Sequence, residues 1–282
     1  MIGGPPTTDD FARKIGADFR GKDAYEGVEQ ANRFASTYRA ITHSRKSFEK
    51  LITLLRQYRM TADEDGVLTL NSPHAIEQPT RWVEVEPLLF QSFEGKRYLA
   101  FREDGKGNIT HLFSRPDSKF TSIIAGTIVL EKLAWYETAG FHKGLLGFCV
   151  LIFLLAPMAW PIVYFIRRLR KQSPEAARPT GYARLLAGLV SALSLVFIIG
   201  VVLTLHFSAY EFAYGVPPFF IALLCIPLAT TVMTVGLLIF TVLAWKNAYW
   251  SVMGRLHYSL ITLAALVFIW FLDYWNLLGF RF

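Results

Sequence analysis

The segment Gly144–Ile166 reads GLLGFCVLIFLLAPMAWPIVYFI and is the first of four long apolar stretches in this chain. It carries no charged side chain, and a transmembrane helix needs about 20 mostly apolar residues. We place the four predicted spans at about 144–166, 185–207, 217–245 and 256–280. Residues 141–282 are therefore predicted to form a four-helix transmembrane bundle.

The basic residues of this half orient the predicted bundle. They lie beside the ends of the spans, at Arg167, Arg168, Arg170, Lys171, Arg178, Arg184, Lys246 and Arg255. The connection between the second and third spans holds Glu211 and no Lys or Arg. Because basic loops stay in the cytoplasm, the first and third connections are predicted to be cytoplasmic. The chain is thus expected to be integral to the cell (inner) membrane, with its N-terminal domain and C-terminus extracytoplasmic.

The N-terminal half has a different composition. Residues 1–143 carry 20 Lys/Arg and 19 Asp/Glu, whereas residues 144–282 carry 9 and 3. We expect a polar lead-in over residues 1–34 and an extracytoplasmic domain over 35–140. The net charge of +7 lies mainly beside the spans, so the lipid bilayer is the expected partner and nucleic acid is not.

Short apolar segments in residues 35–140 alternate with turn residues. Arg81–Val85, Tyr98–Arg102 and Ile109–Ser114 have strand character, and Glu103–Asn108 is a Gly- and Asp-containing turn. This spacing predicts a small antiparallel β-barrel or sandwich. Residues 47–58 have apolar side chains at helical spacing, which predicts a short amphipathic helix covering a hydrophobic opening. The expected fold is an α+β membrane protein.

One tetrad, Ser47-Phe48-Glu49-Lys50, has the Ser-x-x-Lys spacing of penicillin-recognising serine hydrolases. The partner motifs are Tyr-x-Asn, found only at Tyr274-Trp275-Asn276, and a Lys-Gly pair, found at Lys143-Gly144. We predict that these three cannot converge on one pocket. Ser47 and Lys50 are therefore rejected as catalytic residues, and Ser47 is interpreted as the cap of the short helix.

The sequence carries no other catalytic or metal-binding motif. It has no phosphate-binding Gly-Lys-Ser/Thr loop, no His-Glu-x-x-His and no Gly-x-Ser-x-Gly. We therefore expect no cofactor, no metal and no catalytic centre in this chain. Asp273 is the one acidic residue in the spans, and its position near a span end predicts an interfacial location.

Several segments are similar to the C-terminal region of membrane-anchored β-lactamase-related serine hydrolases. They are Arg81–Phe90, Leu99–Asp104, Thr110–Phe113, Trp135–Glu137, Gly254–Tyr258 and Tyr274–Gly279. In that family an outward-facing hydrolase domain precedes a small β-domain and several membrane helices. The resemblance covers about residues 30–282 and corresponds to the second and third parts, so no catalytic residue of the family has a matching position here.

The resemblance implies a non-catalytic membrane-anchor and accessory region, truncated or split from its catalytic domain. Its expected partner is a serine hydrolase catalytic domain, in cis or in trans. The alternatives are a membrane-bound binding or sensor module, a small transporter-like protein, and an enzyme that acts through Ser47. Covalent labelling of Ser47 by a β-lactam or a fluorophosphonate would distinguish the last of these.

Overall fold

Two compact units make up the chain in the computed structural model. Backbone contacts assign residues 1–45 and 51–141 to one unit and residues 46–50 and 142–282 to the other. We call them the barrel unit and the helical unit. The predicted lead-in lies outside the described residues as far as residue 30. The described residues are 31–41, 46–54, 56–63, 67–71, 80–93, 97–116, 128–169, 178–207, 212 and 215–281.

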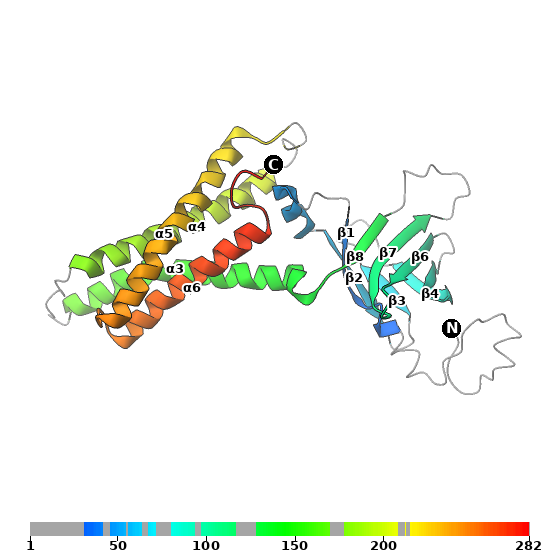
Figure 1. Cartoon of the computed structure of the whole chain (residues 1–282), viewed down its shortest axis with the longest axis horizontal. Helices are drawn as coiled ribbons and strands as arrows, with labels where there is room; N and C mark the ends of the chain where they lie inside the picture. The colour runs from blue at the N-terminus through cyan, green and yellow to red at the C-terminus, as the bar shows by residue number, and fades with distance from the viewer. Residues whose placement is uncertain are drawn as a thin grey trace, which may run out of the picture. The chain divides into compact units, whose positions relative to one another are not determined.

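The barrel unit is a closed antiparallel barrel (Figure 1). Each strand pairs with the next along the chain, and the last pairs with the first. This confirms the predicted antiparallel β-domain and selects the barrel over the sandwich. The strands are β1 (Ser36–Ala40), β2 (Gln57–Ala62), β3 (Leu68–Asn71), β4 (Thr80–Glu86), β5 (Leu89–Ser92), β6 (Arg97–Glu103), β7 (Ile109–Pro116) and β8 (Ile128–Lys132).

The predicted helix over residues 47–58 is wrong in type and length. The structure has a 3₁₀ helix, η1 (Phe48–Leu54), and β2 already begins at Gln57. Gln57 pairs with Arg39 of β1, and its side chain accepts a hydrogen bond of 2.7 Å from the Ala139 backbone nitrogen. Pairing with the preceding strand, β1, thus overrides the helical spacing, as tertiary contacts commonly override local propensity.

Large apolar side chains fill the barrel interior. The ring centroids of Phe34, Phe90 and Phe101 lie 4.6–5.3 Å apart, and the Tyr38 hydroxyl donates a 2.7 Å hydrogen bond to the Phe34 carbonyl oxygen. Eight-stranded barrels either fill their interior with side chains or hold one small ligand, and this interior is of the filled kind. The buried core comprises Ala31, Phe34, Tyr38, Met60, Leu68, Trp82, Phe90, Leu99, Phe101, Ile109, Leu112 and Leu130.

An ion pair reinforces the seam between β1 and β8. Arg39 and Glu131 are register partners, and Arg39 Nε donates a 3.0 Å hydrogen bond to Glu131 Oε1. Glu137 Oε1 lies 3.8 Å from Arg39 Nη2. Arg39 is buried, and charge-assisted bonds of this kind are stronger and more directional than neutral ones. The sequence analysis did not single out this arginine, although it joins the first strand to the last.

Four helices form the rest of the helical unit, and all are long and apolar enough to cross a membrane. This confirms the predicted bundle of membrane-spanning helices. The fourth ends earlier than predicted, at residue 274 and not near 280, because the chain turns there. The helices are α3 (Ala139–Leu169), α4 (Arg178–Phe207), α5 (Pro218–Lys246) and α6 (Val252–Tyr274).

Helices α4 and α5 pack closely at two glycines, each of which faces a leucine of the other helix. A Cβ atom added to Gly200 would lie 2.7 Å from Cδ1 of Leu223, and one added to Gly236 would lie 2.8 Å from Cδ2 of Leu186. On α6, the Thr262 hydroxyl is 2.8 Å from that of Thr241 on α5. Small residues and hydroxyl pairs are the contacts by which membrane helices associate.

The structure locates most of the basic residues that lie beside the predicted spans. Six of the eight lie within helices, not in loops, because the helices extend beyond the apolar spans. Arg167 and Arg168 are in α3, Arg178 and Arg184 in α4, Lys246 ends α5, and Arg255 is in α6. Arg170 and Lys171 lie outside the described residues.

Candidate functional site

The candidate site lies within the helical unit, where residues 46–50 pack against the end of α6. Asn276 Nδ2 donates a 3.0 Å hydrogen bond to the Ser47 carbonyl oxygen. The Phe48 backbone nitrogen donates a 3.1 Å hydrogen bond to the Arg281 carbonyl oxygen. Lys50 Nζ donates to the Tyr274 carbonyl oxygen at 2.5 Å and lies 3.6 Å from the centroid of its ring. We call this arrangement the α6-end cluster.

A left-handed residue shapes the end of α6. Asn276 has φ of +55°, and the Leu277 backbone nitrogen donates a 2.8 Å hydrogen bond back to the Leu272 carbonyl oxygen. Asn tolerates this conformation better than most residues do, and helices often end in this way. The turn stops the helix at Tyr274 and brings the Asn276 amide to the Ser47 carbonyl oxygen.

A buried histidine lies within the same cluster. His142 of α3 is fully buried, and its ring stacks on those of Tyr274 and Trp270 with centroids 4.7 and 5.9 Å away. Trp275 Nε1 donates a 3.2 Å hydrogen bond to His142 Nδ1. Because an indole nitrogen only donates, Nδ1 must accept, which places the proton of the neutral imidazole on Nε2. Aromatic packing therefore ties the start of α3 to the end of α6.

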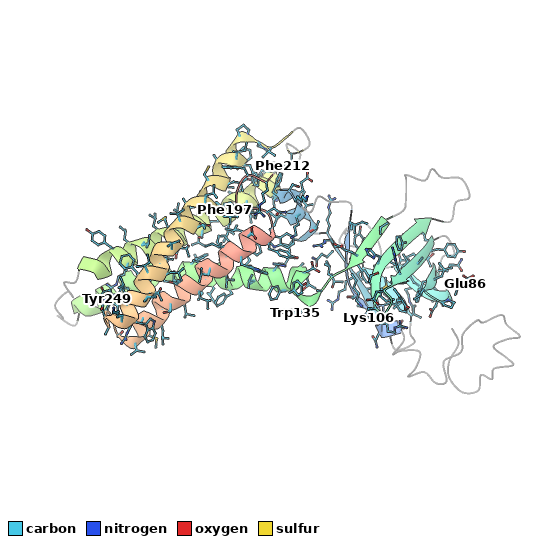
Figure 2. The ribbon with its side chains drawn as sticks, in the orientation of Figure 1. Glu86, Lys106, Trp135, Phe197, Phe212 and Tyr249 are labelled. Carbon is cyan, nitrogen blue, oxygen red and sulfur yellow. The ribbon has the colours of Figure 1, made fainter. Side chains whose placement is uncertain are left out.

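Phenylalanine rings extend this cluster to a third helix. The ring of Phe48 lies 5.2 Å, centroid to centroid, from those of Phe212 and Phe220, the second of which is on α5. Phe212 is labelled in Figure 2. Residues 46–50 thus contact Phe212, helix α5 and the end of α6.

Of the three motifs predicted not to converge on one pocket, the structure brings two, Ser-x-x-Lys and Tyr-x-Asn, into contact. Lys50 lies on the ring of Tyr274, and Asn276 bonds to the backbone of Ser47. The sequence placed Tyr274-Trp275-Asn276 among the membrane spans and residues 47–58 in the β-domain, whereas residues 46–50 belong to the helical unit. His142, which precedes the Lys143-Gly144 pair, lies in the same cluster.

The convergence does not produce the atomic arrangement of a nucleophilic site. A serine nucleophile needs its hydroxyl hydrogen-bonded to a base. The Ser47 hydroxyl instead donates to Glu49 Oε2 at 3.5 Å, while Lys50 Nζ donates to the main-chain oxygen of Tyr274. This contact with Glu49 also replaces the predicted helix cap by Ser47. These hydrogen bonds can hold residues 46–50 and the end of α6 together.

The acid in the predicted fourth span has a local partner. Asp273 is the penultimate residue of α6, and its Oδ1 accepts a 2.8 Å hydrogen bond from Arg281 Nη2. Arg281 Nη1 also donates to Asn276 Oδ1 at 3.1 Å. Both charged side chains are about half exposed, so the pair contributes little to stability, about 0–1 kcal/mol. This arrangement stabilises the turn after α6.

Two further carboxylates in the barrel unit respond to their surroundings. Burial raises the pKa of Glu84, whose Oε1 accepts a 3.2 Å hydrogen bond from the Leu88 backbone nitrogen. Asp104 Oδ1 accepts from the backbone nitrogens of Asn108 and Lys106 at 2.9 and 2.8 Å, and these hydrogen bonds lower its pKa. Glu84 lies within β4, and Asp104 lies in the turn that follows β6. Within the described residues, no group of three or more His, Cys, Asp or Glu could hold a metal ion.

Comparison with known proteins adds no relative to this picture. No family model, no curated protein and no solved structure matches the chain. The class of the molecule is therefore defined by its fold, a closed antiparallel barrel and four helices capable of crossing a membrane.

Proposed function

We propose that this chain is the non-catalytic membrane-anchor and accessory module of a β-lactamase-related serine hydrolase, with its catalytic domain in cis or in trans. One observation supports the non-catalytic part most directly. Ser47 and Lys50 meet Tyr274 and Asn276, but main-chain oxygens accept the bonds that join the two segments. The cluster joins residues 47–50 to the end of α6, and its hydrogen bonds do not form a Ser–Lys proton relay.

The barrel supports the accessory part of the proposal. Its interior is filled by its own aromatic and aliphatic side chains, which favours a packing module over a ligand-binding or sensor module. The link to a serine hydrolase rests on the sequence resemblance over Arg81–Phe90 and Tyr274–Gly279. The bilayer is the other partner of this module.

The basic residues support one orientation of the module. Arg184, Lys246 and Arg255 lie toward the same end of the helical unit, and such residues stay on the cytoplasmic side. We infer that the barrel and the C-terminus are extracytoplasmic in the cell (inner) membrane. Protease added to spheroplasts should cut within the barrel unit. Protection of the barrel, together with cleavage in residues 170–177, would reverse this orientation.

Activity-based labelling tests the proposal. Membranes from cells that express the chain would be treated with a fluorescent β-lactam or fluorophosphonate and then precipitated with an antibody against the barrel. We expect a labelled hydrolase in the precipitate, as a separate band or as a longer polypeptide with the same epitope. Its labelling should be unchanged by Ser47→Ala and by the control Ser36→Ala.

Two results would contradict the proposal. A label on the 32.0 kDa chain itself that disappears in Ser47→Ala, and not in Ser36→Ala, would make the chain an enzyme. The absence of any labelled protein in the precipitate would remove the hydrolase partner.

A further inference from the structure

The short 3₁₀ helix that precedes α3 presents two aromatic rings to its surroundings. This helix, η2 (Trp135–Glu137), belongs to the barrel unit. Trp135 is 72% exposed and Tyr136 is 46% exposed, whereas Trp82 in the barrel interior is 2% exposed. Single exposed apolar residues are common on protein surfaces, but adjoining ones mark interaction surfaces. The two rings therefore indicate a surface that contacts a partner.

A third ring makes this surface continuous with the first turn of α3. The ring centroid of Trp135 lies 5.8 Å from that of Tyr136 and 5.3 Å from that of Phe141, and both contacts are edge-on. Phe141 is in the first turn of α3 and belongs to the barrel unit as well. We call Trp135, Tyr136 and Phe141 the η2 aromatic patch. Figure 2 shows Trp135 on the side of the barrel unit away from Glu86.

Hydrogen bonds to the main chain hold the backbone of the patch in place. The Thr138 hydroxyl donates to the Trp135 carbonyl oxygen at 2.8 Å and accepts from the Phe141 backbone nitrogen at 3.4 Å. Gln57 Nε2 of β2 donates to the Glu137 carbonyl oxygen at 3.2 Å. The rings are thus presented by a fixed turn that is tied to the barrel, so a partner gains their contacts at a small entropic cost.

The position of the patch in the chain identifies a lipid interface as that partner. The first candidate membrane span begins at Ala139, and the stretch without charged residues begins at Gly144. Phe141 precedes Gly144 within the same helix, by about 4.5 Å of helical rise. The headgroup layer extends about 5–8 Å beyond the hydrocarbon core on each side. The ring of Phe141, and that of Trp135 in contact with it, therefore fall within this layer.

We propose that the η2 aromatic patch inserts into the headgroup layer of the bilayer that α3 crosses. Tryptophan and tyrosine favour this layer because their rings are apolar and their N–H and O–H groups are polar. Lys143, which is exposed in the next turn, extends its ammonium group to the same level. The patch sets the depth of α3 in the bilayer and, through Gln57, links β2 to the membrane surface.

This inference rests on the bilayer part of the proposed function and is independent of the hydrolase association. It adds a second membrane contact, made by the barrel unit itself, to the contacts of the four helices. Burial of the patch against protein is the competing interpretation, and the test distinguishes the two.

Fluorescence quenching of the purified full chain in phosphatidylcholine vesicles tests the proposal. The emission of Trp135 is obtained by subtracting the spectrum of Trp135→Phe, which keeps an aromatic ring in the patch. Lipids that carry a nitroxide quencher on the headgroup or at the end of an acyl chain are compared with aqueous iodide. We expect the headgroup label to lower the Trp135 emission at least about twofold, and the acyl-chain label to have a smaller effect.

A tryptophan placed elsewhere on the barrel provides the matched control. Val85 is 40% exposed and adjoins Glu86, which lies on the side of the barrel away from Trp135 (Figure 2). In a chain with both Trp135→Phe and Val85→Trp, the new indole should not respond to the headgroup label. Iodide should quench it at least about threefold more strongly than it quenches Trp135, because the headgroup layer shields an interfacial ring from water.

The tryptophans of the helical unit show whether the chain lies in the bilayer. Trp245 and Trp270 are each 45% exposed on helices that are apolar enough to cross a membrane. Labelled lipids should quench the emission that remains in Trp135→Phe. If they quench this emission but not that of Trp135, the inference is overturned and the bilayer part of the proposed function stands. If they quench neither, both are overturned.

The iodide result identifies the surroundings of a patch that lipid does not quench. Strong quenching of Trp135 by iodide would place its ring in water. Shielding of Trp135 from both iodide and the labelled lipids would show that protein covers the patch, whether the helical unit, a catalytic domain or a second copy of the chain. Either outcome would overturn the inference.

Discussion

The two units differ in how many of their large apolar side chains are exposed. In the barrel, Trp82 and Leu99 are buried in the interior. In the helical unit, Val232 and Val242 are 73% and 66% exposed, while small residues such as Ala187 are fully buried. Many large apolar side chains of the helical unit thus face outward alongside others that are buried, as expected for helices that are apolar enough to cross a membrane.

The comparison shows which forces stabilise each unit. Water drives large side chains into the barrel, so the barrel depends on filling its interior. Lipid gives no such drive between helices, so the helical unit depends on close approach and on hydroxyl pairs. The closest approaches occur at Gly200 and Gly236, and one hydroxyl pair joins Thr241 to Thr262.

Removal of a large barrel side chain should have the largest effect. Trp82→Ala leaves a cavity at a 2% exposed position and should lower the free energy of unfolding of the barrel by about 3–5 kcal/mol. Urea titration of the purified chain, followed by the protease resistance of the barrel, measures this. Val232→Ala is the control and should change the stability of the helical unit by less than about 0.5 kcal/mol. Comparable losses in both variants would break the contrast between the units.

Addition of bulk should destabilise the helical unit instead. In Gly200→Val the new Cβ meets Cδ1, Cδ2 and Cγ of Leu223 at 2.7–3.4 Å, so the Leu223 side chain must shift and the α4–α5 contact must repack. We expect a loss of about 1–3 kcal/mol, measured by circular dichroism during SDS titration. Gly147→Val is the matched control, because a Cβ at Gly147 meets no heavy atom within 4 Å. Equal stability of the two variants would refute close packing at Gly200.

The smallest effect concerns the pH dependence of the barrel. Burial raises the pKa of Glu84 above its ordinary value of 4.5, so the folded state binds this proton more tightly than the unfolded state does. The stability linked to Glu84 is therefore present at low pH and is lost as the pH rises through the ordinary value toward the folded one. Glu84→Gln should raise the Tm slightly at neutral pH and leave it unchanged in acid.

Asp104 provides the opposite slope as a control. Hydrogen bonds from the backbone nitrogen and side chain of Asn108 lower the pKa of Asp104, so its contribution is lost as the pH falls through the folded value. Asp104→Asn should therefore matter at neutral pH and fade in acid. The interpretation fails if the two variants change stability with the same pH dependence.

Local patterns predicted much of the fold because they are periodic or compositional. Long uncharged stretches identified the four helices, and alternation in Arg81–Val85 and Tyr98–Arg102 identified two barrel strands. The turn at Glu103–Asn108 was also predicted, from its Gly and Asp residues. The contact that stabilises it is local, because the Asn108 backbone nitrogen donates to the Asp104 carboxylate four positions earlier. Such signals lie within a few residues of each other and can be read without the rest of the chain.

Most of the missed features join distant segments. β1 was not predicted as a strand, since its pairing with β8 links residues about 90 positions apart, as in Arg39 and Glu131. The early end of α6 depends on Asn276 in a left-handed conformation. The α6-end cluster connects Lys50 to Tyr274 and Asn276 to Ser47, across 224 and 229 positions.

The sequence by itself determined the class of each region, because composition and short-range period decide which solvent a segment prefers. It predicted an apolar bundle after residue 141 and a strand-rich domain before it. The tertiary structure alone decided which motifs meet, and it brought Ser47–Lys50 to Tyr274–Asn276, where main-chain oxygens accept the hydrogen bonds between the two segments. The physical reason is that a hydrogen bond depends on the positions of individual atoms, and these atoms meet only in the folded helical unit.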